Sequence, residues 1–130
     1  KTTARIRGIE AARCEWFERS PWFDVMRTLP DRCRAAEHRA LIEGFSGAPW
    51  QAEDDPEPVS IDAAALAQIG LPVLIVNGEH EVPDFLPAAK ELEITLRNAR
   101  RVIIPDAGGF PLWEFPDRVN REVRFFLTSV

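Results

Sequence analysis

Residues 71–76 read LPVLIV and residues 101–104 read RVII, and these two short apolar runs decide the fold of the chain. Each run is rich in branched apolar residues and bounded by turn-forming residues, which is typical of a parallel strand buried on both faces. Helical periodicity follows the first run over residues 85–96 and the second over residues 116–127. The order strand, helix, strand, helix with short connections predicts a right-handed βαβ unit in an α/β sheet.

The sheet predicted from these runs is incomplete. Two parallel strands that are apolar on both faces need further strands beside them, because a two-stranded sheet leaves its edges and apolar surface uncovered. The sequence of 130 residues contains no other convincing strand. We therefore expect the missing strands to come from another polypeptide segment.

The first part of the chain, residues 1–50, is predicted to be a helical segment. Apolar residues recur with helical spacing from about residue 5 to residue 45. The pattern breaks at Ser20-Pro21, where Ser20 suits an N-cap and Pro21 the first turn of a new helix. Residues 31–44 predict a further helix that ends at Gly44.

A linker separates this helical segment from the α/β part. Residues 51–60, QAEDDPEPVS, are acidic, contain prolines and lack apolar periodicity, so they are expected to be exposed. A short helix is predicted over residues 62–69 and stopped by Gly70-Leu71-Pro72. Residues 61–130 are then expected to form the α/β part.

Composition narrows the classes of function. The net charge is −5 and the arginines are dispersed among acidic residues, which argues against a nucleic-acid partner. No apolar run reaches the roughly 18 residues that span a bilayer, so we expect a cytoplasmic protein with no membrane partner. Cys14 and Cys33 are interpreted as reduced structural thiols, with a disulfide as the alternative. The sequence shows neither a metal-ligand constellation nor a phosphate-binding glycine loop, so we expect no metal and no cofactor.

Longer stretches around the two strands resemble the C-terminal part of α/β-hydrolase-fold enzymes. Residues 66–85 (LAQIGLPVLIVNGEHEVPDF) give a Pro-led apolar strand followed by an acidic loop. Residues 101–127 (RVIIPDAGGFPLWEFPDRVNREVRFFL) give a second strand, an Asp-Ala-Gly turn, a Glu-x-Pro turn and a helix ending in Phe-Phe-Leu. The resemblance implies that residues 61–130 are the C-terminal part of an α/β-hydrolase core. It also implies that residues 1–50 match the helical lid that such enzymes insert before these strands.

The resemblance implies a catalytic relay of a serine, a histidine and a carboxylate. The carboxylate position matches Glu81, with Asp84 as the next candidate and a solvated loop carboxylate as the alternative. The position of the family's histidine is occupied by Gly109, which has no proton-accepting side chain. The chain contains no Gly-x-Ser-x-Gly, the turn that carries the family's serine. The nucleophile is therefore expected in the missing half of the fold.

Three explanations for Gly109 stay open. His80, on the loop after the first strand, acts as a displaced base, unless it is a solvated side chain. Alternatively, the site supports a cyclisation, elimination or isomerisation that needs no serine-histidine relay. The third explanation is a non-catalytic protein that binds a ligand or a partner. His38, flanked by Glu37 and Arg39, is predicted to lie on the surface.

Aromatic side chains near the expected site indicate a small apolar ligand. The candidate substrate-binding residues are Trp16, Trp22, Phe23, Phe110 and Trp113, with core positions as the alternative for the tryptophans and Phe23. We therefore expect an enzyme acting on a small apolar ester, lactone, amide or related carbonyl compound, or a binding protein of the same fold.

The N-terminal half of the fold is the expected protein partner. The chain begins at Lys1, a residue other than Met, in front of the expected lid. Exposed loops are where proteolytic cuts concentrate, so a longer precursor cut before its lid would yield such a chain. We therefore expect a heterodimer in which the N-terminal half is a separate chain from the same precursor.

Overall fold

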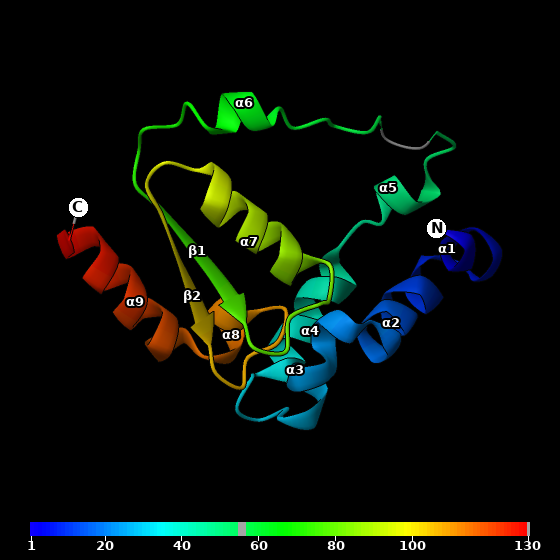
Figure 1. The fold of residues 1–130 in the computed structure, drawn as a ribbon. Coiled ribbons are helices and arrows are strands. Elements are labelled where there is room, and N and C mark those ends of the chain that lie inside the picture. The colour runs from blue at the N-terminus through cyan, green and yellow to red at the C-terminus, as the bar shows by residue number, and fades with distance from the viewer. Residues whose placement is uncertain (55–56, 130) are drawn as a thin grey trace.

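The computed structural model describes residues 1–54 and 57–129. Two strands lie at the centre, with helices on either side of them (Figure 1). The helices of the first part of the chain gather near the arrowhead ends of the strands, which are their carboxyl ends (Figure 1). This arrangement brings the N-terminal helices to the end of the sheet where the strand loops lie.

The two predicted strands pair in parallel. β1 (Val73–Gly78) and β2 (Ala99–Ile104) align Val73 with Ala99 and Gly78 with Ile104. The intervening helix, α7 (Phe85–Thr95), contacts both strands, which confirms the predicted strand, helix, strand order. Among the described residues β1 and β2 pair only with each other, so each leaves one edge without a partner strand.

Two further helices follow β2. The final helix, α9 (Pro116–Ser129), confirms the predicted one and contacts both strands, on the opposite side from α7 in Figure 1. A short helix that the sequence analysis did not predict, α8 (Pro111–Glu114), precedes it. Proline in the first turn suits α8, because a helix leaves its first N–H groups unpaired in any case. Buried side chains join β2, its loop and these helices in one core cluster: Ile104, Ala107, Phe115 and Val119.

The helical segment before the linker contains more helices than predicted. They are α1 (Thr2–Arg7), α2 (Ile9–Arg19), the 3-10 turn η1 (Pro21–Phe23), α3 (Asp24–Thr28), α4 (Ala35–Gly44) and α5 (Ala48–Gln51). Gly8, with φ +87°, breaks the first predicted helix in two. The predicted break at Ser20 is confirmed, because the Trp22 N–H donates to Ser20 Oγ at 3.4 Å. We call residues 1–51 the lid segment after the sequence prediction, and a role as a lid stays a prediction.

The lid segment has an apolar core of its own. Its buried side chains come from four of the helices and from the turn between them: Phe17, Phe23, Met26, Cys33, Ala35 and Ile42. Cys33 is buried within it and Cys14 is exposed, and both are free thiols. None of the helices in the described part of the chain is long and apolar enough to cross a membrane.

The connection from the lid segment to β1 contains one short described helix, α6 (Ala63–Leu66). The Asp62 side chain caps it by accepting from the Ala64 N–H at 2.9 Å, which agrees with the predicted helix start. Residues 55–56 of the predicted linker lie outside the described residues. Val59 and Ile61 are 87% and 70% exposed, so the described residues leave these apolar side chains uncovered.

Gly78, the last residue of β1, lets the loops after β1 and β2 meet backbone to backbone. A Cβ at this position would lie 2.1 Å from the Gly108 carbonyl oxygen and 2.4 Å from the Ala107 carbonyl oxygen. The loops are joined by two backbone hydrogen bonds, from the Glu79 N–H to the Ile104 carbonyl at 3.0 Å and from the His80 N–H to the Ala107 carbonyl at 2.7 Å. The Asp106 N–H also donates to Glu79 Oε2 at 3.0 Å. Any larger residue at position 78 would force the loops apart.

We therefore expect Gly78→Ala to lower the free energy of unfolding by roughly 1–3 kcal/mol, because two carbonyl groups must move to admit one methyl group. Urea unfolding followed by circular dichroism measures the change. Gly70→Ala is the matched control, since a Cβ on Gly70 has no neighbour within 4 Å. Equal effects of the two substitutions would contradict the proposed loop contact.

Candidate functional site

The candidate site lies where the loops after β1 and β2 meet the lid segment. Both loops leave the carboxyl ends of parallel strands, which is where open α/β sheets bind ligands. The loop after β1 carries Glu81, and the loop after β2 carries Gly108 and Gly109. Gly78 lets the two loops come into contact, so the packing of their backbones determines how the site is framed.

Glu81 lies beside Gly109. A Cβ on Gly109 would be 3.4 Å from Glu81 Oε1, an ordinary van der Waals contact. The carboxylate is half-buried, and its Oε1 accepts a hydrogen bond from the Val82 N–H at 3.0 Å. The acid and base positions implied by the sequence are thus neighbours, and their catalytic roles stay predictions.

The space in front of Gly109 is filled by Trp22 of the lid segment. A Cβ on Gly109 would lie 2.9 Å from Trp22 Cε3 and 3.2 Å from the Trp22 carbonyl oxygen. The indole also packs against Phe85, with ring centroids 4.8 Å apart, and against Phe110, at 5.7 Å. Glycine at position 109 therefore lets the lid segment approach the loop closely.

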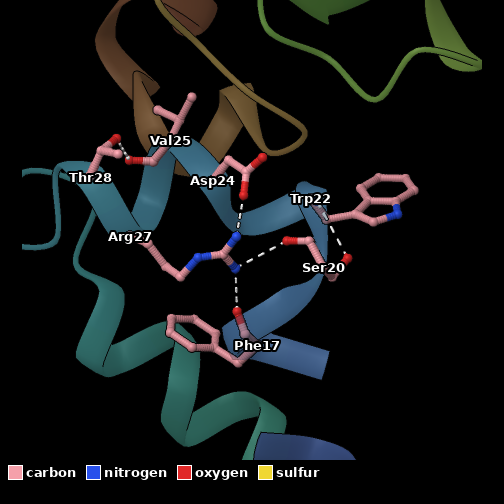
Figure 2. Close-up of polar contacts among 7 residues, drawn as sticks. All are labelled: Phe17, Ser20, Trp22, Asp24, Val25, Arg27 and Thr28. Carbon is pink, nitrogen blue, oxygen red and sulfur yellow. Dashed lines mark hydrogen bonds and ion pairs between the residues drawn. The ribbon is translucent and has the colours of Figure 1, made fainter. Parts of the chain in front are cut away.

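Arg27 holds the turn that presents Trp22. Its guanidinium donates to the carbonyl groups of Phe17 and of Ser20, the latter at 3.0 Å, and pairs with the Asp24 carboxylate (Figure 2). These bonds join the end of α2 to the start of α3 across the 3-10 turn. The Trp22 indole points away from this network (Figure 2). The network leaves the indole free to pack on the strand loops.

The two other titratable candidates on the β1 loop are exposed. The His80 backbone N–H bonds to the loop after β2, whereas its side chain lies at the surface. Asp84 occupies the N-cap position of α7, and its exposed side chain makes no capping hydrogen bond. The structure brings neither side chain to Gly109 as closely as it brings Glu81.

Phe23 is a core residue of the described structure, the alternative that the sequence left open, and its role in substrate binding stays a prediction. Its side chain is fully buried in the lid segment, at 0% exposure. It stacks on Phe110, with ring centroids 5.1 Å apart and planes tilted by 18°. Phe110 is half-buried in this contact, so it joins the loop after β2 to the lid core. The spacing of apolar residues in the sequence cannot distinguish a residue packed in the core from one that lines a pocket.

Trp16 and Trp113 also make packing contacts. Trp16 lies within the lid segment against Phe45 and Trp50, at centroid distances of 6.3 and 5.2 Å. The Trp113 Nε1–H donates to the Cys33 carbonyl oxygen at 2.6 Å, which fastens α8 to the lid segment. Their roles in substrate binding stay predictions, and Trp22 is the predicted aromatic residue that the structure places beside Gly109.

His38 is half-buried among aromatic rings, so the prediction of a surface position is wrong. Its imidazole contacts the rings of Phe23, Phe110 and Trp113 at centroid distances of 5.3, 4.8 and 5.3 Å. Nδ1 is buried without a hydrogen-bond partner among the described residues. The charged neighbours in the sequence occupy other faces of α4, so they do not indicate where the imidazole lies.

Burial lowers the pKa of His38 below its ordinary value of 6.5. At pH values just under 6.5 the folded state then binds fewer protons than the unfolded state. His38 therefore contributes stability above that pH, and this contribution is lost as the pH falls through the pKa of the folded state. We expect the His38 ring signals of His80→Gln, which has no other histidine, to titrate below 6.5 by nuclear magnetic resonance. A titration at or above 6.5 would show that the imidazole is solvated.

Glu114 is a buried carboxyl group to which the sequence analysis gave no role. It is 2% exposed, and its Oε2 accepts the Gly108 N–H at 2.5 Å. Burial raises its pKa, hydrogen bonds from the Gly108 and Phe110 backbones oppose the rise, and the charge of Glu81 adds to it. Oε1 is buried without a partner among the described residues, as is Asn77 Oδ1 at the end of β1. The Glu-Phe-Pro motif in the sequence could have singled out Glu114. This side chain holds the backbone of Gly108.

Because the pKa of Glu114 is raised in the folded state, the group contributes stability at low pH that is lost as the pH rises through the folded pKa. Glu114→Gln keeps an oxygen acceptor for Gly108 and carries no charge. We therefore expect its stability, relative to the unsubstituted protein, to improve between about pH 4 and pH 7 in urea unfolding. Glu114→Ala loses the acceptor and should be destabilised by about 1–3 kcal/mol at both pH values. A pH-independent difference for Glu114→Gln would contradict a raised pKa of the buried carboxyl group.

The described residues also form a cavity outside this site. This cavity of about 420 Å³ lies between α2 and α4, lined by Cys14, Phe17 and Ile42 together with charged side chains. Within the described residues, no group of three His, Cys, Asp or Glu side chains is placed to hold a metal ion.

Comparisons with known proteins give the fold. No protein-family model matches the chain, and no curated protein matches it. A similar solved structure is that of BpoC from Mycobacterium tuberculosis, described as a non-heme bromoperoxidase, with 24% sequence identity and a TM-score of 0.55. The match covers 97% of this chain and 53% of that one, so the chain spans about half the length of that structure. The likeness shows an α/β-hydrolase-like fold, and the arrangement of elements is consistent with its C-terminal portion.

Proposed function

We propose that the chain is the C-terminal portion of an enzyme of α/β-hydrolase-like fold that acts on a small apolar ester, lactone, amide or related carbonyl compound. The observation that carries the proposal is the placement of the Glu81 carboxylate, 3.4 Å from where a Cβ on Gly109 would lie. Both residues sit at the carboxyl ends of parallel strands, beneath an aromatic lid segment. The half-buried rings of Trp22 and Phe110 give the site an apolar side that suits such a substrate.

The proposal includes a partner segment that supplies the remaining strands. β1 and β2 each leave one edge unpaired within the described residues. Apolar side chains near these strands are uncovered, with Leu71 at 73% exposure, Ile94 at 69% and Ile103 at 46%. Strand edges and apolar surface of this kind are unfavourable in water and pair readily with further strands. The N-terminal half of the same fold, as a separate chain from one precursor, is the partner that fits, and it would carry any serine nucleophile.

A second candidate function is a non-hydrolytic reaction or ligand binding on the same fold. It is favoured by Gly109, because a serine-histidine relay needs a proton acceptor at that position. Trp22, which fills the space there, has no basic nitrogen in its indole. An assembled protein that binds aryl esters without hydrolysing them would establish this alternative.

We expect mass spectrometry under native conditions to show a second polypeptide bound to this chain, and denaturing conditions to separate the two. Burial of the unpaired strand edges gives the physical reason for the association. The partner's sequence can then be searched for the serine turn that this chain lacks. A monomer of 14.7 kDa that unfolds cooperatively by itself would refute the partner and the incomplete sheet.

A further inference from the structure

We propose that Glu81 itself accepts the proton from an attacking water molecule, and that Trp22 takes the place of the missing imidazole and shapes the site around this carboxylate. The inference rests on the proposed function and specifies which residue carries out its proton transfer. It differs from the relay implied by the sequence, in which the carboxylate only orients a histidine.

The first step of the argument is that the place of the imidazole is occupied. Even the Cβ of a larger residue at position 109 would meet Trp22 Cε3 at 2.9 Å and the Trp22 carbonyl oxygen at 3.2 Å. An imidazole there would have to displace both the indole and the backbone of the lid segment. Gly109 and Trp22 therefore fit each other as a pair, and a larger side chain at position 109 would have to shift Trp22 before it could stand beside Glu81.

The second step concerns the two oxygens of Glu81. The Val82 N–H holds Oε1 at 3.0 Å, which fixes the orientation of the carboxylate. Oε2 accepts no hydrogen bond from the part of the chain that the structure describes. A carboxylate with one oxygen held and the other open can accept a proton from a water molecule within hydrogen-bond distance.

The third step is that both sides of this contact are held in place. On the lid side, Arg27 joins the ends of the turn that carries Trp22, as Figure 2 shows. On the strand side, Glu114 Oε2 accepts the Gly108 N–H at 2.5 Å. Catalytic groups act efficiently when their positions are fixed before the reaction. Trp22 is thus a positioning residue and Glu81 the catalytic residue.

The reaction balances for an ester and one water molecule. An O–H bond of the water breaks, its proton passes to Glu81 Oε2, and its electron pair stays on the water oxygen. That oxygen bonds to the carbonyl carbon, while the C=O π electrons move onto the carbonyl oxygen. When they return, the bond to the alkoxide breaks and the alkoxide takes the proton from Glu81. The products are an acid and an alcohol, and the carboxylate is regenerated.

The test uses the assembled protein, this chain with its partner, and the hydrolysis of p-nitrophenyl acetate. We expect Glu81→Gln to lower kcat by at least ~100-fold, since general-base catalysis contributes on the order of 10²–10⁴-fold. Its melting temperature should not change. Glu91→Gln, an exposed residue on α7, is the matched control and should keep full activity. A fluorophosphonate that labels activated serines should leave both the activity and the mass of the protein unchanged.

Substitutions at the matched pair test the role of Trp22. We expect Trp22→Ala to raise KM more than it lowers kcat, and Trp22→Phe to recover most of the loss, because a ring still covers the loop. Gly109→His should lower both the activity and the melting temperature, since the new side chain displaces Trp22.

Three results would overturn the inference and leave the proposed function standing: full activity in Glu81→Gln, a fluorophosphonate adduct that abolishes hydrolysis, or a gain of activity in Gly109→His. Absence of hydrolysis of every ester and lactone by the assembled protein would overturn the inference and the proposed function together.

Discussion

The backbone contact between the end of β1 and the loop after β2 is the constraint on which the rest of the site depends. Gly78 leaves no room for a side chain, with the Gly108 carbonyl oxygen 2.1 Å from where a Cβ would lie. Parallel pairing alone brings two strand ends to the same edge, but it does not determine how their loops cross. Because the loops cross in contact, Glu81 on one of them reaches Gly109 on the other.

The lid segment is fastened to these loops by aromatic packing. Phe110 stacks on Phe23, the Trp113 indole donates to the Cys33 carbonyl, and Trp22 fills the space in front of Gly109. These contacts also enclose two titratable groups, His38 and Glu114. Burial lowers the pKa of His38 and raises the pKa of Glu114, because it penalises the charged form of each. The junction of lid and strands is therefore apolar in character, and Glu81 lies half-buried beside it.

The sequence predicted the elements of the fold better than the contacts between them. Branched apolar runs and helical periodicity identified both strands, α7 and α9, because these signals are local. The break at Gly8 and the separate helix α8 were missed, since single residues with permissive or fixed φ angles decide them. His38 was misjudged because its charged neighbours gave the wrong face. The contact of Trp22 with Gly109 joins residues far apart in the chain, so no local pattern could reveal it.

The Gly109 position shows why a resemblance in sequence has to be judged in three dimensions. The resemblance makes this glycine a missing base, and a missing base alone would indicate lost activity. In the structure Trp22 of the lid segment packs directly against the same glycine, so the absence of a side chain there allows this contact. A residue that is needed for packing in this way limits which neighbouring side chains can take part in a reaction. With the indole of Trp22 in place, the half-buried carboxylate of Glu81 is the side chain that the loop after β1 brings next to Gly109.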